Sequence, residues 1–481
     1  MNYGIIIKVL GDLLLFEIIA LIPSLIISLF TGGKDLLAFV YSILLLLLIG
    51  FPMTKVSVKT KRIKARDALL IVTLGWVFAS FFGALPFVFS SSIPSLVDAF
   101  FETVSGFTTT GATLLSDIEV LPKGILFWRS FTHWIGGMGI LVLTIAILPA
   151  IGVGGYQIFK AESPGPITDK LVPKIKDTAK ILYTLYLGLT ILQTALLCFG
   201  GMSLFESLIH TFGTVGTGGF SSRNSSVGAF KSSYIVFVIA IFMIASGINF
   251  PLYYEIIKGR WKNVIKNSEL KLYLGIIGIS TILITLNLYG KVYSSFFETF
   301  KHALFQVSSI ITTTGYSTTD FNKWTDFSKG ILFLLMFVGG SAGSTGGGIK
   351  VIRLLIMGKL VKREILKLLH PRAFIPIKLN GKITQSDVVV SVTSFFFLYM
   401  VIFALSTLLI SLEGIDFFSS ASAVAATLGN IGPGFEMVGP TQNFGFFSPL
   451  SKILFSLLML FGRLELFTVF LFFVPEFWKN N

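Results

Sequence analysis

The stretch SGFTTTGAT (105–113) decides the fold, because three related strings recur further along the chain. They are TFGTVGTGGF (211–220), SIITTTGYS (309–317) and TLGNIGPGF (427–435). Aligned on one glycine each, the four strings are separated by intervals of 107, 97 and 117 residues; the aligned glycines are Gly111, Gly218, Gly315 and Gly432. Each string follows a short apolar segment and precedes a long one. The sequence therefore predicts four copies of one structural unit.

The composition around these strings is that of a membrane protein. Of 481 residues, 53% are apolar and only 13% are charged, about half the ~25% charged content of soluble domains. This excludes soluble globular and disordered classes, and the single Cys198 excludes a disulfide scaffold. A bilayer core needs about 20 apolar residues per helix. Runs of that kind predict membrane helices near 5–30, 36–54, 68–92, 124–150, 179–200, 232–257, 270–289, 329–360, 387–412 and 450–475.

Four shorter apolar segments lie directly before the strings, near 97–110, 204–216, 296–313 and 416–429. They are too short to cross a bilayer, so each is predicted to be a re-entrant half-helix. The predicted fold is an all-α polytopic membrane protein with four helix–pore-loop–helix repeats around a pseudo-fourfold pore. The predicted organisation is an N-terminal two-helix extension (1–54) followed by repeats 55–157, 158–257, 258–370, with a broken inner helix, and 371–481.

Charge predicts the orientation. The stretches 55–67, 158–180, 255–271 and 350–382 hold 25 of the 38 Lys and Arg but 7 of the 24 Asp and Glu. Cytoplasmic loops collect Lys and Arg, so these stretches and both termini are expected in the cytoplasm. Topology alone explains the basic loops, and docking of a cytosolic partner or anionic lipid is an added possibility. No aqueous basic domain is long enough for nucleic acid binding.

Irregular backbone at membrane depth is tolerated where it lines a water-filled path. Four extended strings around one axis would present rings of carbonyl oxygens, which replace the hydration shell of an alkali cation. TVGTG (214–218) differs by one residue from the potassium-channel loop TVGYG. The predicted filter residues are Thr109, Thr110, Gly111, Gly216, Thr217, Gly218, Thr313, Thr314, Gly315, Asn430, Ile431 and Gly432. The competing interpretation, extracellular turns rich in small residues, does not explain the half-helix before each string.

The chain resembles the TrkH family, the membrane subunits of Trk-type bacterial potassium uptake systems in the Trk/Ktr/HKT superfamily. The resemblance covers essentially the whole chain. Its motifs include FWRSFTHWIGGMGILVL (127–143), the four strings, GGSAGSTGGGIKVIR (339–353) and GRLELFT (462–468). It implies a homodimer with one pore per protomer above a cytosolic TrkA-like ring that binds a nucleotide. The chain itself has no dinucleotide or phosphate-loop motif in a suitable context, so any nucleotide is expected on the partner, and no bound cofactor is expected here.

The predicted span 329–360 contains a glycine-rich segment with six glycines in ten residues, each costing ~1 kcal/mol in a helix. This segment, the glycine loop, is Gly339, Gly340, Ser341, Ala342, Gly343, Ser344, Thr345, Gly346, Gly347 and Gly348. A flexible loop just inside the filter could close the path, and the resemblance implies an intramembrane gate. Close packing of small residues is the alternative. The pattern Gly339-x-Ser341-x-Gly343 also matches a hydrolase nucleophile elbow, but the context is helical rather than strand-to-helix.

Arg463 lies in an otherwise apolar span, where a charge costs at least ~2.5 kcal/mol and usually faces a water path or the bundle interior. The resemblance implies an electrostatic barrier to cations there, so Arg463 joins the predicted gate. An ion pair with Glu465 is the alternative, although residues two apart on a helix do not face each other.

The expected function is potassium uptake across the bacterial inner membrane, driven by membrane potential and gated by the cytosolic partner. Potassium is the transported ion, and no catalytic residues are expected. The alternative is a symporter coupled to sodium or protons. A proton relay needs intramembrane carboxylates, and the sequence indicates no partner for either candidate, Glu102 or Glu465.

Overall fold

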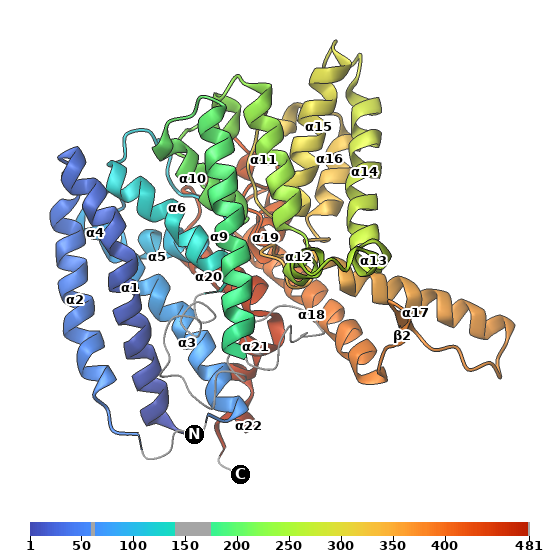
Figure 1. The fold of residues 1–481 in the computed structure, drawn as a ribbon, viewed down its shortest axis with the longest axis horizontal. Coiled ribbons are helices and arrows are strands. Elements are labelled where there is room, and N and C mark those ends of the chain that lie inside the picture. The colour runs from blue at the N-terminus through green and yellow to red at the C-terminus, as the bar shows by residue number, and fades with distance from the viewer. Residues whose placement is uncertain (59–62, 140–174, 480–481) are drawn as a thin grey trace.

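Apolar helices make up most of the structure, a computed structural model that describes residues 1–58, 63–139 and 175–479 (Figure 1). Among these residues, six helices are long and apolar enough to cross a membrane, and a seventh span arises if a bent pair is counted as one. The only strands in the described ranges are β1 (Lys378–Leu379) and β2 (Lys382–Ile383), which form one short antiparallel hairpin. The predicted all-α polytopic class is therefore confirmed.

In chain order the helices are α1 (Tyr3–Thr31), α2 (Leu36–Thr54), α3 (Ala65–Gly83), α4 (Leu85–Phe89), α5 (Leu96–Phe107), α6 (Lys123–Gly137), α9 (Ile175–Phe199), α10 (Leu204–Val215), α11 (Ser233–Ser246), α12 (Phe250–Ile257), α13 (Trp261–Lys266), α14 (Ser268–Leu288), α15 (Phe296–Ile311), α16 (Asp326–Leu335), α17 (Val351–Leu369), α18 (Ser386–Ser411), α19 (Phe417–Leu428), α20 (Pro449–Leu464), α21 (Leu466–Phe470) and α22 (Pro475–Trp478).

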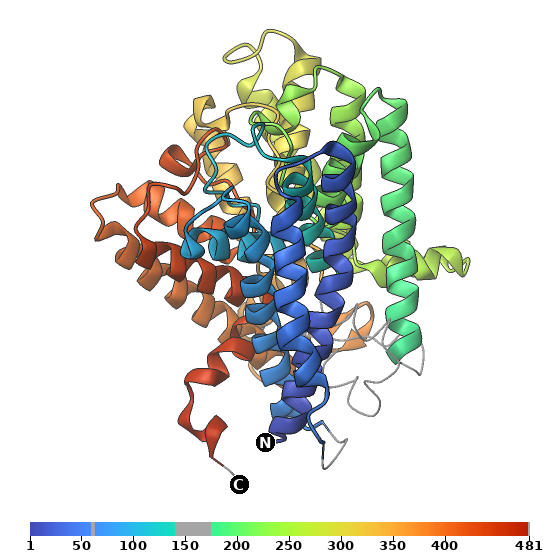
Figure 2. The same ribbon diagram turned by 90° about the vertical axis from the view of Figure 1, so that its left-hand side faces the viewer.

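The N-terminal pair α1 and α2 lies at one side of the body, and α1 packs against α3 and α6 (Figures 1 and 2). A buried carboxylate fixes this pair to the rest of the chain. Asp35 accepts hydrogen bonds from the Ser28 hydroxyl at 2.6 Å and from the Ile125 amide at 3.1 Å. The second bond satisfies a free N–H in the first turn of α6, where a negative charge is favourable.

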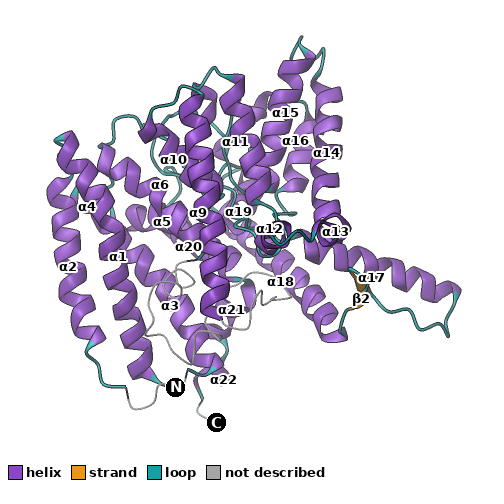
Figure 3. Ribbon diagram, in the orientation of Figure 1, coloured by secondary structure: helices purple, strands orange, loops and turns teal. Residues whose placement is uncertain are grey.

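Four short helices, α5, α10, α15 and α19, correspond to the predicted half-helices. Each begins at a residue whose side chain accepts a backbone N–H of the first turn, which is the usual reason a helix starts where it does. These caps are Ser95, Ser203, Ser295 and Asp416. The half-helices pack against neighbouring helices: α5 against α20 and α6, α10 against α6 and α11, and α15 against α11 and α16. The loops that follow the half-helices gather near the centre of the body (Figure 3).

Two predicted spans are wrong in detail, because the chain breaks where it was expected to run straight. Residues 232–257 form α11 and α12, which meet at an angle of 93°. Pro251 lies in the first turn of α12, where its missing N–H does no harm, so the chain restarts a helix there. Residues 450–475 break between α20 and α21 at Glu465, whose φ is +65°. The break expected in 329–360 is present: α16 ends at Leu335 and α17 begins at Val351.

Some predictions fall outside the described residues. These are the second part of the span 124–150, the boundary between the first two repeats at 157/158, most of the basic stretch 158–180, and part of the basic stretch 55–67. The N-terminus and α22 lie at the same end of the body in both views (Figures 1 and 2). The prediction that both termini are cytoplasmic stays a prediction.

Candidate functional site

The four strings adopt one backbone conformation. After the last residue of each half-helix comes one capping residue, then a non-glycine residue with positive φ, and two residues later a glycine with positive φ. The first group is Thr109 (φ +56°), Thr217 (+56°), Thr313 (+60°) and Asn430 (+54°). The glycines are Gly111 (+80°), Gly219 (+81°), Gly315 (+81°) and Gly432 (+98°). Left-handed backbone is uncommon outside glycine, so its recurrence at the same place in four strings marks one shared structure.

The register of the second string differs from the sequence alignment by one residue. Gly219, and not Gly218, is the structural equivalent of Gly111. The amide of Gly218 bonds to the Gly213 carbonyl at 2.7 Å, just as the amide of Thr110 bonds to Ser105 at 2.9 Å. Gly216, predicted as a filter residue, is also the C-terminal cap of α10. Two consecutive glycines at 218 and 219 left the alignment ambiguous, and only the backbone conformation resolves it.

The strings meet one another in a closed cycle. A Cβ atom on Gly111 would lie 2.0 Å from the Gly218 carbonyl oxygen. The same relation joins the second string to the third, the third to the fourth and the fourth to the first; the pairs are Gly219 with Thr314 oxygen (2.0 Å), Gly315 with Ile431 oxygen (1.9 Å) and Gly432 with Thr110 oxygen (2.7 Å). No side chain fits at these four positions. The cycle places one carbonyl oxygen of each string against the glycine of the preceding string.

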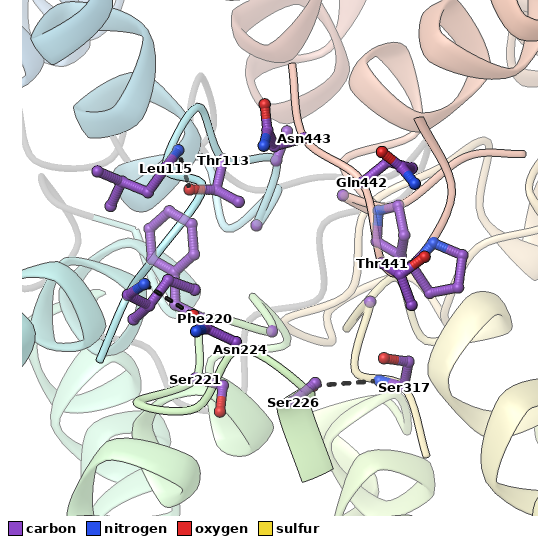
Figure 4. A pocket seen from close by; sticks show the side chains of 18 of the residues that line it. Thr113, Leu115, Phe220, Ser221, Asn224, Ser226, Ser317, Thr441, Gln442 and Asn443 are labelled. Carbon is purple, nitrogen blue, oxygen red and sulfur yellow. Dashed lines mark hydrogen bonds between the residues drawn. The ribbon is translucent and has the colours of Figure 1, made fainter. Parts of the chain in front are cut away.

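A cavity of about 150 Å³ lies above this cycle (Figure 4). One positive-φ glycine from each string lines it, together with polar side chains that include Asn224, Thr441, Gln442 and Asn443. Local bonds hold its wall: the Thr113 hydroxyl accepts from the Leu115 amide at 3.2 Å, and the Ser226 hydroxyl accepts from the Ser317 amide at 3.2 Å. The cavity is thus a polar mouth that opens onto all four strings.

The glycine loop is buried directly against the third and fourth strings. Its Gly347 amide donates to the Thr313 hydroxyl oxygen at 2.6 Å, and a Cβ on Gly347 would lie 2.7 Å from the Gly429 carbonyl oxygen. Farther back, the Ser341 amide bonds to the Gly247 carbonyl at 2.9 Å, where α11 turns into α12. Glu269 accepts from the Ala342 amide at 2.7 Å. All ten residues except Gly343 are buried. The loop therefore lies between the strings and the bend that separates α11 from α12.

Arg463, in the last turn of α20, is 9% exposed and donates to three backbone carbonyls. Nη1 bonds to the Thr345 oxygen of the glycine loop at 2.7 Å, and Nη2 bonds to the oxygens of Gly136 and Gly137 at the end of α6. Free carbonyls at a helix C-terminus favour a cation. The guanidinium thus joins the glycine loop to the end of α6.

The structure provides partners for both carboxylates that the sequence indicated were unpaired. Glu102 forms a fully buried ion pair with Arg129 at 2.7 Å and accepts from the Leu114 amide at 3.0 Å. Glu465 forms an ion pair with Arg353 at the start of α17. Arg129 and Arg353 were missed by sequence reasoning. Their signal was a charged residue within an apolar or glycine-rich stretch, but nothing local identifies which acid each one meets.

The hydrolase pattern does not assemble a catalytic centre in the described residues. The Ser341 hydroxyl has no hydrogen-bond partner there. The buried histidines are engaged elsewhere: His133 with Gly106 and Phe220, and His210 with Glu206 and Ser221. A base within hydrogen-bond reach of the nucleophile is the first requirement of such a site. Within the same residues no group of three or more His, Cys, Asp or Glu is placed to hold a metal ion.

Comparison with known proteins finds similarity to one family of transport proteins along the chain. Residues 36–480 match the TrkH family model, described as a cation transport protein. The chain is 41% identical to the Trk system potassium uptake protein TrkH of Escherichia coli K12, and 40% identical to that of Vibrio parahaemolyticus, with all of each chain covered. The crystal structure of the potassium transporter TrkH from Vibrio parahaemolyticus superposes with a TM-score of 0.89 at 37% identity, again covering both chains fully. The chain therefore belongs to the TrkH family of cation transport proteins.

Proposed function

We propose that this protein takes up potassium through a selective, channel-like pore formed by its four strings. The observation that carries the proposal is the closed cycle in which four strings of identical backbone conformation touch one another. The relatives that cover the whole chain are named potassium uptake proteins, and transport rather than catalysis is the proposed activity.

The proposed ligands of the ion are backbone carbonyl oxygens rather than charged side chains. They belong to the two residues before each positive-φ glycine: Thr109 and Thr110, Thr217 and Gly218, Thr313 and Thr314, Asn430 and Ile431. Carbonyl rings replace the hydration shell of potassium. The negative C-terminal ends of α5, α10, α15 and α19 lie just before these residues and add a field that favours a cation.

The driving force in this proposal is the membrane potential. A unit charge that moves inward through 100 mV gains about 2.3 kcal/mol, which concentrates potassium without a chemical cycle. The direction requires the cavity above the strings to face outward and the basic stretches and both termini to face the cytoplasm of a bacterial cell, with the chain in the inner membrane.

The proposed gate consists of the glycine loop and Arg463. The loop's Gly347 is hydrogen-bonded to the third string, and Arg463 is bonded to the loop's Thr345. A positive charge and a strand of backbone at this level would both oppose a cation that leaves the filter. Because the glycines resist helix formation, the loop can change its conformation without breaking a helix.

Regulation is proposed to come from a cytosolic, nucleotide-binding TrkA-like ring that acts on a homodimer of this chain. The support is the family and the basic stretches of the chain, such as 350–382, which the proposed orientation places in the cytoplasm. In this proposal the chain consists of the N-terminal extension 1–54 and four structural repeats, with the boundaries 55–157, 158–257, 258–370 and 371–481. Movement of α17 is the proposed means by which a partner pulls the glycine loop, since Lys350 at its start bonds to the Gly346 carbonyl.

Reversal potentials of purified protein in planar bilayers test the proposal. We expect the reversal potential to follow potassium and rubidium gradients and to ignore a pH gradient or a small sodium gradient. A matched control is Gly278→Ala, since this exposed α14 glycine has open space around it. A reversal potential that follows protons or sodium with a fixed stoichiometry would replace the channel by a symporter. Absence of cation current in folded protein would overturn both.

A further inference from the structure

The second string lacks two side chains that the first and third strings possess. In the first string the hydroxyls of Thr108 and Thr110 are hydrogen-bonded at 2.8 Å, and in the third string those of Thr312 and Thr314 form the same bond at 2.8 Å. All four threonines are fully buried. The equivalent residues of the second string are Gly216 and Gly218. Neither glycine has a positive φ, so the backbone conformation does not require glycine at either position.

The residue His133 of α6 occupies the space that the missing side chains would fill. A Cβ on Gly218 would lie 2.3 to 2.5 Å from three atoms of the imidazole ring. A Cβ on Gly216 would lie 2.5 Å from the His133 carbonyl oxygen. Both distances are far shorter than any contact a real Cβ atom makes. The glycine at 218 is therefore explained by the His133 ring, and the glycine at 216 by the close approach of the His133 backbone.

Hydrogen bonds hold the imidazole from both sides. Nδ1 lies 2.6 Å from the Gly106 carbonyl oxygen in the last turn of α5, and Nε2 accepts from the Phe220 amide at 3.1 Å. A carbonyl can only accept and an amide can only donate, so the ring is neutral with its proton on Nδ1. The ring also stacks on Phe220 with 4.1 Å between centroids. His133 thus links the first half-helix to the end of the second string.

This link acts at one of the four contacts of the cycle. The Gly218 carbonyl oxygen faces Gly111 of the first string, and the Gly218 Cα rests against the imidazole. We propose that His133 is a positioning residue for ion selection, which sets the place of the Gly218 carbonyl by replacing the missing side chains of the second string. The proposal rests on the proposed function, in which these carbonyls select the ion.

The test compares rubidium and sodium uptake per folded molecule in proteoliposomes. His133→Ala should lower the rubidium-to-sodium ratio about five- to ten-fold, because the hydrogen bonds at both ends of the ring are lost. Gly218→Ala should also lower the ratio, because the new Cβ collides with the ring. The double variant His133→Ala/Gly218→Ala should lie closer to the wild type than either single variant, since the alanine Cβ has the space that the ring occupied. If the logarithm of the rubidium-to-sodium ratio falls in the double variant by the sum of its falls in the two single variants, the two residues act independently and the proposal is overturned.

Two controls separate this proposal from the function on which it rests. His302→Ala changes a partly exposed histidine that contacts Thr318, and it should leave the ratio unchanged. Gly111→Ala perturbs the cycle without touching His133. If Gly111→Ala alters the ratio and His133→Ala does not, the positioning role is wrong while the filter stands. If neither alters the ratio, the filter itself is wrong. Should His133→Ala fail to fold, His133→Asn and Gly218→Ala decide, and an unchanged ratio in both would refute the role.

Discussion

The amide of Gly347 donates a 2.6 Å hydrogen bond to the hydroxyl oxygen of Thr313. Thr313 is the positive-φ residue of the third string, and Gly347 belongs to the glycine loop. The proposed filter and the proposed gate are therefore in direct contact, with no intervening residue. A change at the loop can be transmitted to the filter through this one hydrogen bond. A variant that removes the bond therefore tests this contact alone.

Thr313→Val should raise basal rubidium uptake about five-fold, because the loop loses a hydrogen bond worth ~1 kcal/mol in the closed arrangement. Valine keeps the size and the branching of threonine, so the string should keep its conformation. Thr313→Ser, which retains the hydroxyl, serves as the control and should behave like the wild type. Uptake per folded molecule is the measurement, and equal values for valine and serine would show that this bond does not hold the loop.

Deletion of Gly346, Gly347 and Gly348 should raise basal uptake without a change in the rubidium-to-sodium ratio. The loop lies against the strings but contributes none of the proposed ion ligands. Tracer flux for both ions in proteoliposomes gives the two quantities together. A folded deletion variant with no flux would identify the loop as structural packing and remove it from the gate.

Arg463→Ala should raise cation uptake about ten-fold, equivalent to ~1.4 kcal/mol in the barrier. A guanidinium 4 Å from a passing cation opposes it by about 4 kcal/mol at an effective dielectric of 20, and mobile water reduces this figure. Arg463→Lys should give an intermediate value, since lysine keeps the charge on a flexible stem. Arg463→Glu should give at least the uptake of the alanine variant.

The control for Arg463 is Arg260→Ala, which removes an arginine that is 63% exposed. If Arg463 is only structural and acts through its bonds to Thr345, Gly136 and Gly137, the expected result is different. In that case all three variants would show lower stability and equal or lower uptake per folded molecule.

Gly219→Ser should admit sodium more readily than the wild type does. Its Cβ would meet the Thr314 carbonyl oxygen at 2.0 Å and its φ is +81°, so the carbonyl must move. Gly111→Ser and Gly315→Ser should act in the same way, while Thr110→Ser should keep the wild-type preference. Rubidium and sodium uptake report the outcome, with Gly278→Ser as the control. Unchanged selectivity in all three glycine variants would remove the strings from the filter.

Arg353→Met should lower the free energy of unfolding by about 2–3 kcal/mol, because it leaves the Glu465 carboxylate without its guanidinium partner. The side chains are 4% and 20% exposed, so the cost should be lower than for a fully buried pair. Methionine keeps an apolar stem of similar length, but it also removes the guanidinium that lies 3.9 Å from the Phe395 ring centroid. The double variant Arg353→Met/Glu465→Gln should recover most of the loss in a thermal unfolding assay in detergent. If the double variant is as unstable as the single one, the ion pair is not the source of the effect.

Local sequence patterns were sufficient for the membrane class, for four of the short helices and for the break in the third inner helix. Apolar length predicts membrane helices because the bilayer thickness is fixed. The start of each half-helix is encoded by a capping residue such as Ser95 or Asp416. The glycine content of 339–348 predicts a break because glycine disfavours a helix wherever it occurs. The family followed from motifs that the comparisons bear out.

Other features depended on contacts between residues distant in the sequence. The bend of 93° after α11 and the break at Glu465 were not expected, since apolar runs look alike whether the helix is straight or broken. The partners Glu102 and Arg129 are 27 residues apart, and Arg353 and Glu465 are 112 apart. Spacing in the sequence carries no signal for pairs of this kind.

The register of the second string is a feature that the sequence pattern leaves open and that tertiary contacts determine. Composition and periodicity are local quantities, and they located a glycine string after a half-helix without distinguishing Gly218 from Gly219. The distinction arises because the His133 ring presses on one glycine and the Thr314 carbonyl on the other. The first contact comes from α6 and the second from the third string, both distant from the second string in the sequence. The sequence determined that four similar strings exist, and the packing of each repeat against the next decided which atoms of those strings face one another.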